Sequence, residues 1–127
     1  MAKYLSEEWG EAVRSALNND ESFKNASKGV QLTIQQVITG GPEGEVKYWS
    51  AISDGSISGG NGEADGPDVT ITQDYETAAA LNRQELNAQA AFMQGKLKVT
   101  GNMGKLLQHQ GVLQAMGPVM AGVPTEY

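Results

Sequence analysis

The side chains best suited to acid–base chemistry in this sequence are one histidine and several aspartates. His109 is the only histidine, and a catalytic histidine needs an orienting carboxylate and a reacting partner. The nearest acidic residues along the chain are Glu85 and Glu126, and no serine follows Ser58. We therefore expect His109 to lie at the surface or at the edge of a pocket. An enzyme that uses His109 or a turn aspartate on a hydrophobic substrate stays an alternative, because folding brings distant groups together.

Five oxygen-bearing side chains gather in one stretch and raise the question of a metal site. They are Asp54, Asn61, Glu63, Asp65 and Asp68, in DGSISGGNGEADGPD. Their spacing fits no EF-hand loop, and GGNGEAD departs from the repeat G-G-x-G-x-D by one position and occurs once. Aspartate at a turn has an ordinary structural role. The sequence therefore predicts no metal site and no cofactor.

Two glycine-rich stretches raise the question of a phosphate site. They are GGPEGEVK at residues 40–47 and GGNGEADG at residues 59–66. Neither has the G-x-x-x-x-G-K-[ST] spacing of a phosphate-binding loop, and neither has the dinucleotide-binding fingerprint. We interpret both as turns between strands.

The composition is that of a folded domain without thiol chemistry. The 127 residues are 39% hydrophobic and 19% charged and include no cysteine, which excludes disulfides, catalytic thiols and cysteine-based zinc sites. The first residues are acidic where a secretion signal has its apolar core. No stretch approaches the ~18 apolar residues of a membrane span. We expect a single domain over residues 1–127 in the cytoplasm.

The charge is distributed unevenly along the chain. Residues 1–85 hold six basic and fourteen acidic side chains, whereas the rest of the chain holds Lys96, Lys98 and Lys105 against one glutamate. An acidic body disfavours nucleic acid as a partner, because neutralising phosphates drives that affinity. The three lysines are expected to be either solvated or in transient contact with an anionic membrane surface.

The methionines indicate an apolar binding surface. Four of the five methionines fall within the last 35 residues, at Met93, Met103, Met116 and Met120. Methionine is flexible and polarisable, which suits a surface that adapts to varied apolar partners. Ordinary core packing is the competing interpretation. Glycine and proline interrupt the last predicted helix, which favours a helix that is loosely fixed and able to open and close a cavity.

The periodicity of apolar residues predicts the elements that position these side chains. A helix is expected over residues 5–18 with Ser6 as its N-cap, followed by a short helical turn around Phe23. Apolar residues on both faces of the predicted strand at 46–53 suggest a sheet covered on both sides by helices or ligand. The other expected elements are strands at 30–38, 56–59, 68–72 and 96–100, helices at 74–82 and 86–94, and one final helix from Met103 to Met120. This order predicts an α+β fold in one domain.

Residues 68–107 resemble the C-terminal half of the sterol carrier protein 2 family of small lipid-transfer domains. The stretches DVTITQDYETAAALN and NAQAAFMQGKLKVTGNMGKLLQ carry the resemblance. Its most specific part is AFMQGKLKVTGNMG, in which Gly95 and Gly101 bracket a short strand and Asn102 begins a helix. The N-terminal half is similar to the family mainly in its order of elements.

The resemblance implies a five-stranded, mostly antiparallel sheet flanked by about five helices and enclosing an apolar tunnel. It implies a carrier of fatty acid, fatty acyl-CoA, phospholipid or sterol-like ligands, without catalytic residues or cofactor. Phe92, Leu97, Val99 and Met103 fall at positions expected to line or support the tunnel, and the final helix would be its lid. Gln84-Glu85 stands where the family commonly has Gly-Lys, and His109 stands where an apolar residue is usual.

We therefore predict a lipid-binding carrier that is a monomer or a weak dimer. A protein-interaction module that uses the same apolar groove is the further alternative. The predicted ligand-binding residues are Phe92, Met93, Leu97, Val99, Met103, Leu106, Leu107, Gln110, Leu113, Met116 and Met120.

Overall fold

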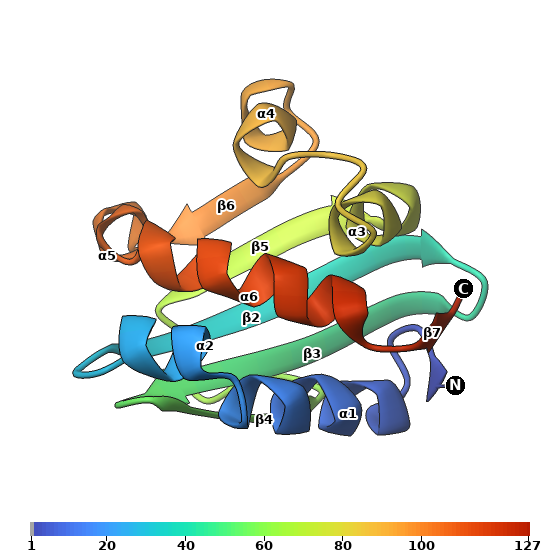
Figure 1. Cartoon of the computed structure of the whole chain (residues 1–127). Coiled ribbons are helices and arrows are strands. Elements are labelled where there is room, and N and C mark those ends of the chain that lie inside the picture. Colours follow the sequence, from blue (N-terminus) through green and yellow to red (C-terminus); the bar gives the residue numbers. More distant parts are fainter. Residues whose placement is uncertain (1) are drawn as a thin grey trace.

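The computed structural model describes residues 2–127, which form a sheet covered by helices (Figure 1). The strands are β1 Ala2–Lys3, β2 Gln31–Gly41, β3 Gly44–Ser53, β4 Ser56–Asn61, β5 Val69–Asp74, β6 Lys98–Gly101 and β7 Thr125–Glu126. The helices are α1 Glu7–Asn18, α2 Glu21–Ala26, α3 Tyr75–Asn82, α4 Ala88–Met93, α5 Met103–Gln108 and α6 Gln110–Gly122.

Five strands form the main sheet in the order β4-β3-β2-β5-β6. Neighbouring strands are antiparallel except for β2 and β5, which are parallel and need the long connection through β3 and β4. The turn between β3 and β4 is the predicted Asp54-Gly55 pair, whose φ angles of 42° and 85° suit a tight hairpin of the I′ type. The predicted α+β fold with a five-stranded, mostly antiparallel sheet is confirmed.

Side-chain caps define where the first two helices begin. The Ser6 hydroxyl accepts a hydrogen bond from the Trp9 backbone N–H, as predicted, and the Asp20 carboxylate accepts one from the Phe23 N–H. The buried residues of α1 are Trp9, Val13 and Leu17. Their spacing of four residues places them on one stripe of the helix, which therefore packs against the sheet.

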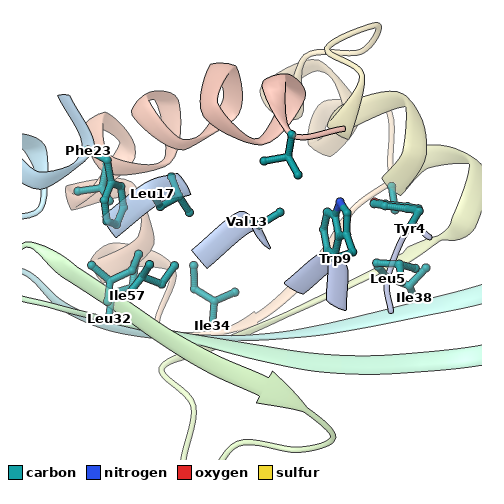
Figure 2. Close-up of a cluster of buried hydrophobic side chains, with 14 of the residues drawn as sticks. Tyr4, Leu5, Trp9, Val13, Leu17, Phe23, Leu32, Ile34, Ile38 and Ile57 are labelled. Carbon is teal, nitrogen blue, oxygen red and sulfur yellow. The ribbon is translucent and has the colours of Figure 1, made fainter. Parts of the chain in front are cut away.

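Part of the hydrophobic core lies between these two helices and strands β2, β3 and β4, and the same cluster includes Val69 on β5, Ala78 on α3 and Val112 on α6. Leu17 and Phe23 have no solvent-exposed surface, and Leu32 and Ile52 retain 1% of theirs. Figure 2 shows Val13, Leu17 and Phe23 above Leu32, Ile34 and Ile57 of the same cluster. This region has the tight packing that stabilises a small domain.

The opposite face of the sheet is covered by a loop and not by helices. Of the two coverings expected there, helices are thus not found on this face, and ligand stays a prediction. Helices α1, α2, α3 and α6 all lie over one face (Figure 1). On the other face the Gln35 amide donates to the Gly62 carbonyl oxygen at 3.0 Å and accepts from the Ala64 N–H at 2.6 Å. Gln35 is only 5% exposed, because the connection between β4 and β5 lies across it.

The C-terminal helical region consists of two helices, so the prediction of one helix from Met103 to Met120 is wrong. The break falls at His109, whose φ of −109° ends α5 and precedes α6. Asn102 caps α5 through a 3.0 Å hydrogen bond from the Lys105 N–H, as predicted. Helix α6 continues through Pro118 to Gly122 and lies alongside α1 and α2 (Figure 1).

The two ends of the chain meet in a small parallel sheet that the sequence analysis did not predict. Ala2 pairs with Thr125 and Lys3 with Glu126. The Tyr4 ring packs 4.9 Å from the Tyr127 ring, between centroids. These contacts fix the C-terminal end of α6. Among residues 2–127, no helix combines the length and apolar character needed to cross a membrane.

Candidate functional site

The face of the sheet under the helices, which we call the inner face, carries no charged side chain. Residues that are register partners on neighbouring strands lie on the same face of the sheet. Starting from the buried Leu32 and Ile34, the register therefore identifies the inner-face residues of every strand. The inner-face residues are Leu32, Ile34, Gln36 and Ile38 on β2; Val46, Tyr48, Ser50 and Ile52 on β3; Ile57, Gly59 and Asn61 on β4; Val69, Ile71 and Gln73 on β5; and Val99 and Gly101 on β6. The lysines and acids of these strands point to the other face or lie at strand ends.

Three of these residues form a row across β2, β5 and β6 that is incompletely covered. Gln36 is the register partner of Ile71, and Ile71 is the partner of Val99. All three side chains are half-buried, whereas Ile34 and Val69, one step along the same strands, are 4% and 1% exposed. The inner face is therefore incompletely covered along the row Gln36–Ile71–Val99.

Part of the predicted ligand-binding set packs against the core from the C-terminal helices. Leu106 on α5 and Leu113, Met116 and Met120 on α6 are half-buried and contact the core cluster. Helix α6 lies over the inner face (Figure 1) and contacts α1, α2 and α3, so its side chains belong to the helical layer that covers the sheet. Their partial exposure distinguishes them from the fully buried residues of α1.

The other predicted residues are distributed between half-buried and exposed positions. Leu97, Val99 and Met103 are half-buried, and Gln110 is exposed. Three large apolar side chains point into solvent: Phe92 is 44% exposed, Met93 79% and Leu107 54%. On α4 only Ala91 is fully buried, and α4 projects beyond β6 at the edge of the sheet (Figure 1). The structure thus does not bring all eleven residues together.

Gly101, at the end of β6, allows this edge strand to approach β5 closely. Gly101 has φ +100°, and a Cβ there would lie 2.5 Å from the Asp68 carbonyl oxygen. Any other residue would push β6 away from β5 and displace Val99 from the row. The Gly101-Asn102 pair of the sequence motif therefore has a structural role, which is to end β6 sharply and begin α5.

Two depressions in the surface lie away from the predicted ligand-binding residues. An open hollow of about 520 Å³ lies between the Ala12 and Ala16 side of α1 and the segment from Pro118 to Pro124. A smaller cavity of about 50 Å³ lies between Tyr4, Ile38 and Tyr75. Neither contains any of the eleven residues, so their role in binding stays a prediction.

The acidic residues considered for chemistry or metal binding have structural partners. The Asp68 carboxylate accepts from the Thr33 N–H at 2.8 Å and lies 3.1 Å from the Lys105 ammonium. The Thr33 hydrogen bond and the Lys105 charge lower the pKa of Asp68. Asp74 caps α3, and the hydrogen bond from the Thr77 N–H lowers its pKa.

Asp54 and Glu63 also have structural partners, and no group among the described residues orients His109. Asp54 accepts from the Gly29 N–H at 2.8 Å and Glu63 pairs with Lys47. In the described part of the chain, residues 2–127, no three acidic or histidine side chains gather as a metal site would require. His109 is half-buried at the junction of α5 and α6, and none of the side-chain hydrogen bonds within residues 2–127 orients its ring.

A sequence model of the SCP-2 sterol transfer family matches residues 12–114, which is most of the chain. The chain belongs to the SCP-2 sterol transfer family. The resemblance recognised in AFMQGKLKVTGNMG is thereby confirmed, and it extends well into the N-terminal half.

Individual relatives support the same assignment. Human sterol carrier protein 2 is 47% identical over 45 residues, which are 35% of this chain and 8% of that protein. The fatty acid-binding protein of Yarrowia lipolytica is 27% identical over 109 residues, which are 82% of this chain and 84% of that protein. The matched region spans only 8% to 11% of the length of several curated relatives.

A solved structure shows the fold of the SCP-2 family in this chain. A crystal structure of sterol carrier protein 2 superposes with a TM-score of 0.83 and covers 96% of this chain and 100% of that chain, at 21% sequence identity. Similarity in fold at this identity concerns the arrangement of the sheet and helices. The ligand of this chain has to be inferred from its own residues.

Two polar residues on the inner face of this SCP-2 domain were not predicted from the sequence. Gln36 and Gln73 occupy positions at which strict alternation predicts an inward side chain, after Leu32 and Ile34 on β2 and after Val69 and Ile71 on β5. The signal was present in VQLTIQQVI and DVTITQ. It was masked because Val37 and Ile38 together blur the alternation near the end of β2.

Proposed function

We propose that this chain is a lipid-binding carrier that holds one apolar ligand between the inner face of the sheet and α6. The observation that carries the proposal is the half-covered row Gln36–Ile71–Val99 on a face without charges. The leucines and methionines of α5 and α6 lie over this face. Membership of the SCP-2 sterol transfer family supports the same conclusion.

The mechanism needs shape and apolar surface but no reactive group. An acyl chain gains ~0.8 kcal/mol for each methylene that it buries, so about ten methylenes offset the costs of association and ordering. Helix α6 contains Gly111, Gly117 and Pro118, which weaken it internally. We infer that α6 moves to admit the ligand and then closes over it.

The ligand classes that fit this mechanism are fatty acid, fatty acyl-CoA, phospholipid and sterol-like molecules. The Yarrowia lipolytica relative is named a fatty acid-binding protein, so acyl ligands belong in this set. A carrier in the cytoplasm, acting as a monomer or weak dimer, is the simplest form of the proposal. An enzyme is disfavoured because none of the ion pairs within residues 2–127 joins His109 to a carboxylate that would orient its ring.

Native mass spectrometry of the purified protein, followed by organic extraction, tests the proposal. We expect a mass above that of the chain and a lipid that is released on extraction. We also expect uptake of added fatty acid by protein that has been stripped of lipid. A lipid-free mass together with no uptake of fatty acid or acyl-CoA would contradict the carrier function, and would favour a module that binds a partner helix.

We further propose that the α4–β6 edge touches the membrane during loading and release. Lys96 and Lys98 are exposed there beside the exposed Phe92 and Met93. Cations near an anionic surface attract it, and exposed apolar side chains insert at the interface. Lys105 is held by Asp68 and is 28% exposed, so we assign the contact to Lys96 and Lys98.

A further inference from the structure

A pair of glutamines interrupts the apolar inner face between β2 and β5. The Gln73 amide nitrogen donates to the Gln36 amide oxygen at 2.8 Å. Gln73 is 8% exposed, and its own amide oxygen, Oε1, is buried without a hydrogen-bond partner. The two residues lie on adjacent strands, one step apart in the register, with Ile71 and Ile38 as their cross-strand partners.

A buried acceptor without a donor is unfavourable for the empty protein. Leaving such a group unpaired costs about 1 to 3 kcal/mol, and apolar residues occupy most of the neighbouring positions on the same face. Gln35 shows the usual solution, since its amide oxygen receives the Ala64 N–H on the other face of the sheet. Gln73 Oε1 receives no such hydrogen bond. A ligand with a hydrogen-bond donor would supply it.

The position of the pair determines how such a ligand would lie. On one side, Ile38 is 1% exposed and closes the inner face. On the other side, the half-buried Ile71 and Val99 continue towards β6 and the loosely covered α4 edge. A lipid with its polar end at Gln73 therefore has its apolar chain along Ile71 and Val99, where α6 covers it.

The charge of the surroundings determines which polar end is accepted. The inner face carries no lysine or arginine, so an ionised carboxylate or phosphate buried there would have no counter-charge. A carboxylate would also face the lone pairs of Oε1 with no proton to donate. A hydroxyl group is neutral and donates the hydrogen bond that Oε1 lacks.

We propose that the Gln36–Gln73 pair binds the polar end of the carried lipid and selects a neutral, hydroxyl-bearing lipid over an ionised one. This inference rests on the proposed carrier function and makes it more specific. Gln73 is the specificity-determining residue, and Gln36 positions it by accepting from its amide nitrogen. The ligand class is a lipid alcohol, which includes long-chain alcohols, monoacylglycerols and sterol-like molecules.

Three probes whose main chain has twelve carbons test this proposal on protein stripped of lipid. They are dodecan-1-ol, its methyl ether and laurate, measured by displacement of a bound fluorescent lipid at pH 8, where laurate is ionised. The proteins are the unmodified chain, Gln73→Met and, as matched control, Gln31→Met at an exposed position at the start of β2. Comparing alcohol with ether in each protein isolates the hydroxyl interaction, because the apolar chain is the same.

We expect Gln73→Met to raise the Kd of the alcohol relative to that of the ether by about five- to tenfold, the loss of one hydrogen bond. The control should leave this ratio unchanged, and the unmodified chain should bind the alcohol more tightly than laurate. If all three probes bind, and the ratio of the alcohol Kd to the ether Kd is the same in Gln73→Met and in Gln31→Met, then the role of Gln73 is overturned and the carrier function stands. Binding of none would overturn both.

A second measurement keeps the proposal testable if Gln73→Met does not fold. In the unmodified protein, the side-chain amide resonances of Gln73 and Gln36 can be followed by ¹⁵N–¹H NMR. Dodecan-1-ol should shift both amides, because the new bond at Gln73 Oε1 also polarises its bond to Gln36. Dodecyl methyl ether should shift them less. Equal shifts with both probes would show that the hydroxyl does not reach Gln73.

Discussion

The two phenylalanines of this chain lie in contrasting surroundings. Phe23 on α2 has no exposed surface, whereas Phe92 on α4 is 44% exposed. The same contrast holds for the regions around them. Helix α1 packs on β4, and α1 and α2 share one buried cluster with β2, β3 and β4, a region that we call the packed half. The region of α4, β6 and α5, which we call the open side, holds exposed or half-buried apolar residues.

This difference indicates how one small domain divides stability from binding. Residues buried on folding contribute to the free energy of unfolding in proportion to the apolar area removed from water. Apolar residues left half-covered contribute less to folding but can lose further exposed area when a ligand arrives. Regions that move for binding are drawn from the less stable part of a structure. The open side has that character here.

The strongest test of this division is the same substitution at both phenylalanines. Phe23→Ala should lower the free energy of unfolding by about 3 to 5 kcal/mol, because it leaves a cavity in a closely packed core. Phe92→Ala should change it by much less, about 1 kcal/mol, since 44% of Phe92 is already exposed and its removal leaves no closed cavity. Urea denaturation of both variants measures the difference. Similar losses would show that the open side is as closely packed as the other half.

The second test concerns two neighbouring residues of α6. Leu113 is half-buried against the core, and Gln114 is exposed. Leu113→Lys should weaken lipid binding more than about tenfold, because a charge on the inner side must be desolvated when the ligand enters. Gln114→Lys should change the Kd by less than about twofold. Fluorescence displacement measures both, and each variant is first checked for cooperative unfolding. Equal effects would place the ligand away from α6.

The elements of the packed half could be predicted from local signals. Ser6 before an apolar stripe, the alternation of Leu32 and Ile34, and Asp54-Gly55 between two strands each follow from short-range physical rules. The split between α5 and α6 could not be predicted, because no glycine or proline lies at His109 and tertiary packing decides where the helix breaks. The pairing of β1 with β7 joins residues at opposite ends of the chain, which no local pattern reveals.

The candidate site was predictable in composition but not in arrangement. The leucines and methionines of α5 and α6 were predicted to bind ligand from their types and spacing. Four of them, Leu106, Leu113, Met116 and Met120, contact the core cluster, and their role in binding stays a prediction. The exposure of Phe92 and Met93 depends on how far α4 projects from the sheet. The inward direction of Gln36 and Gln73 depends on strand register. Both are set by long-range contacts that sequence spacing does not contain.

The third test concerns Asp68, whose contacts connect the open side to the packed half. Asp68 at the start of β5 accepts from Thr33 on β2 and pairs with Lys105 on α5. Its pKa is lowered from the usual 3.8, so its ionised form stabilises the fold above that pH. This contribution is lost as the pH falls through the lowered pKa.

Asp68→Asn should therefore cost about 1 kcal/mol at pH 7 and progressively less as the medium is acidified. Urea denaturation between pH 7 and pH 2.5 measures the dependence. Asp65→Asn, an exposed position in the preceding loop, is the matched control and should behave like the unmodified chain. A difference between Asp68→Asn and the unmodified chain that persists unchanged at low pH would show that charge is not its cause.

The smallest expected effect is electrostatic and concerns the outer surface of the open side. Lys96→Gln or Lys98→Gln should weaken binding to vesicles of anionic phospholipid by about three- to fivefold each, the contribution of one lysine near such a surface. Sedimentation with vesicles at low salt measures it, and the effect should vanish as added salt screens the charges. Lys28→Gln, exposed in the packed half, removes the same charge from the other region. If Lys28→Gln weakens vesicle binding as much as Lys96→Gln and Lys98→Gln do, then the net charge of the protein governs the attraction, and the open side is not the specific membrane contact.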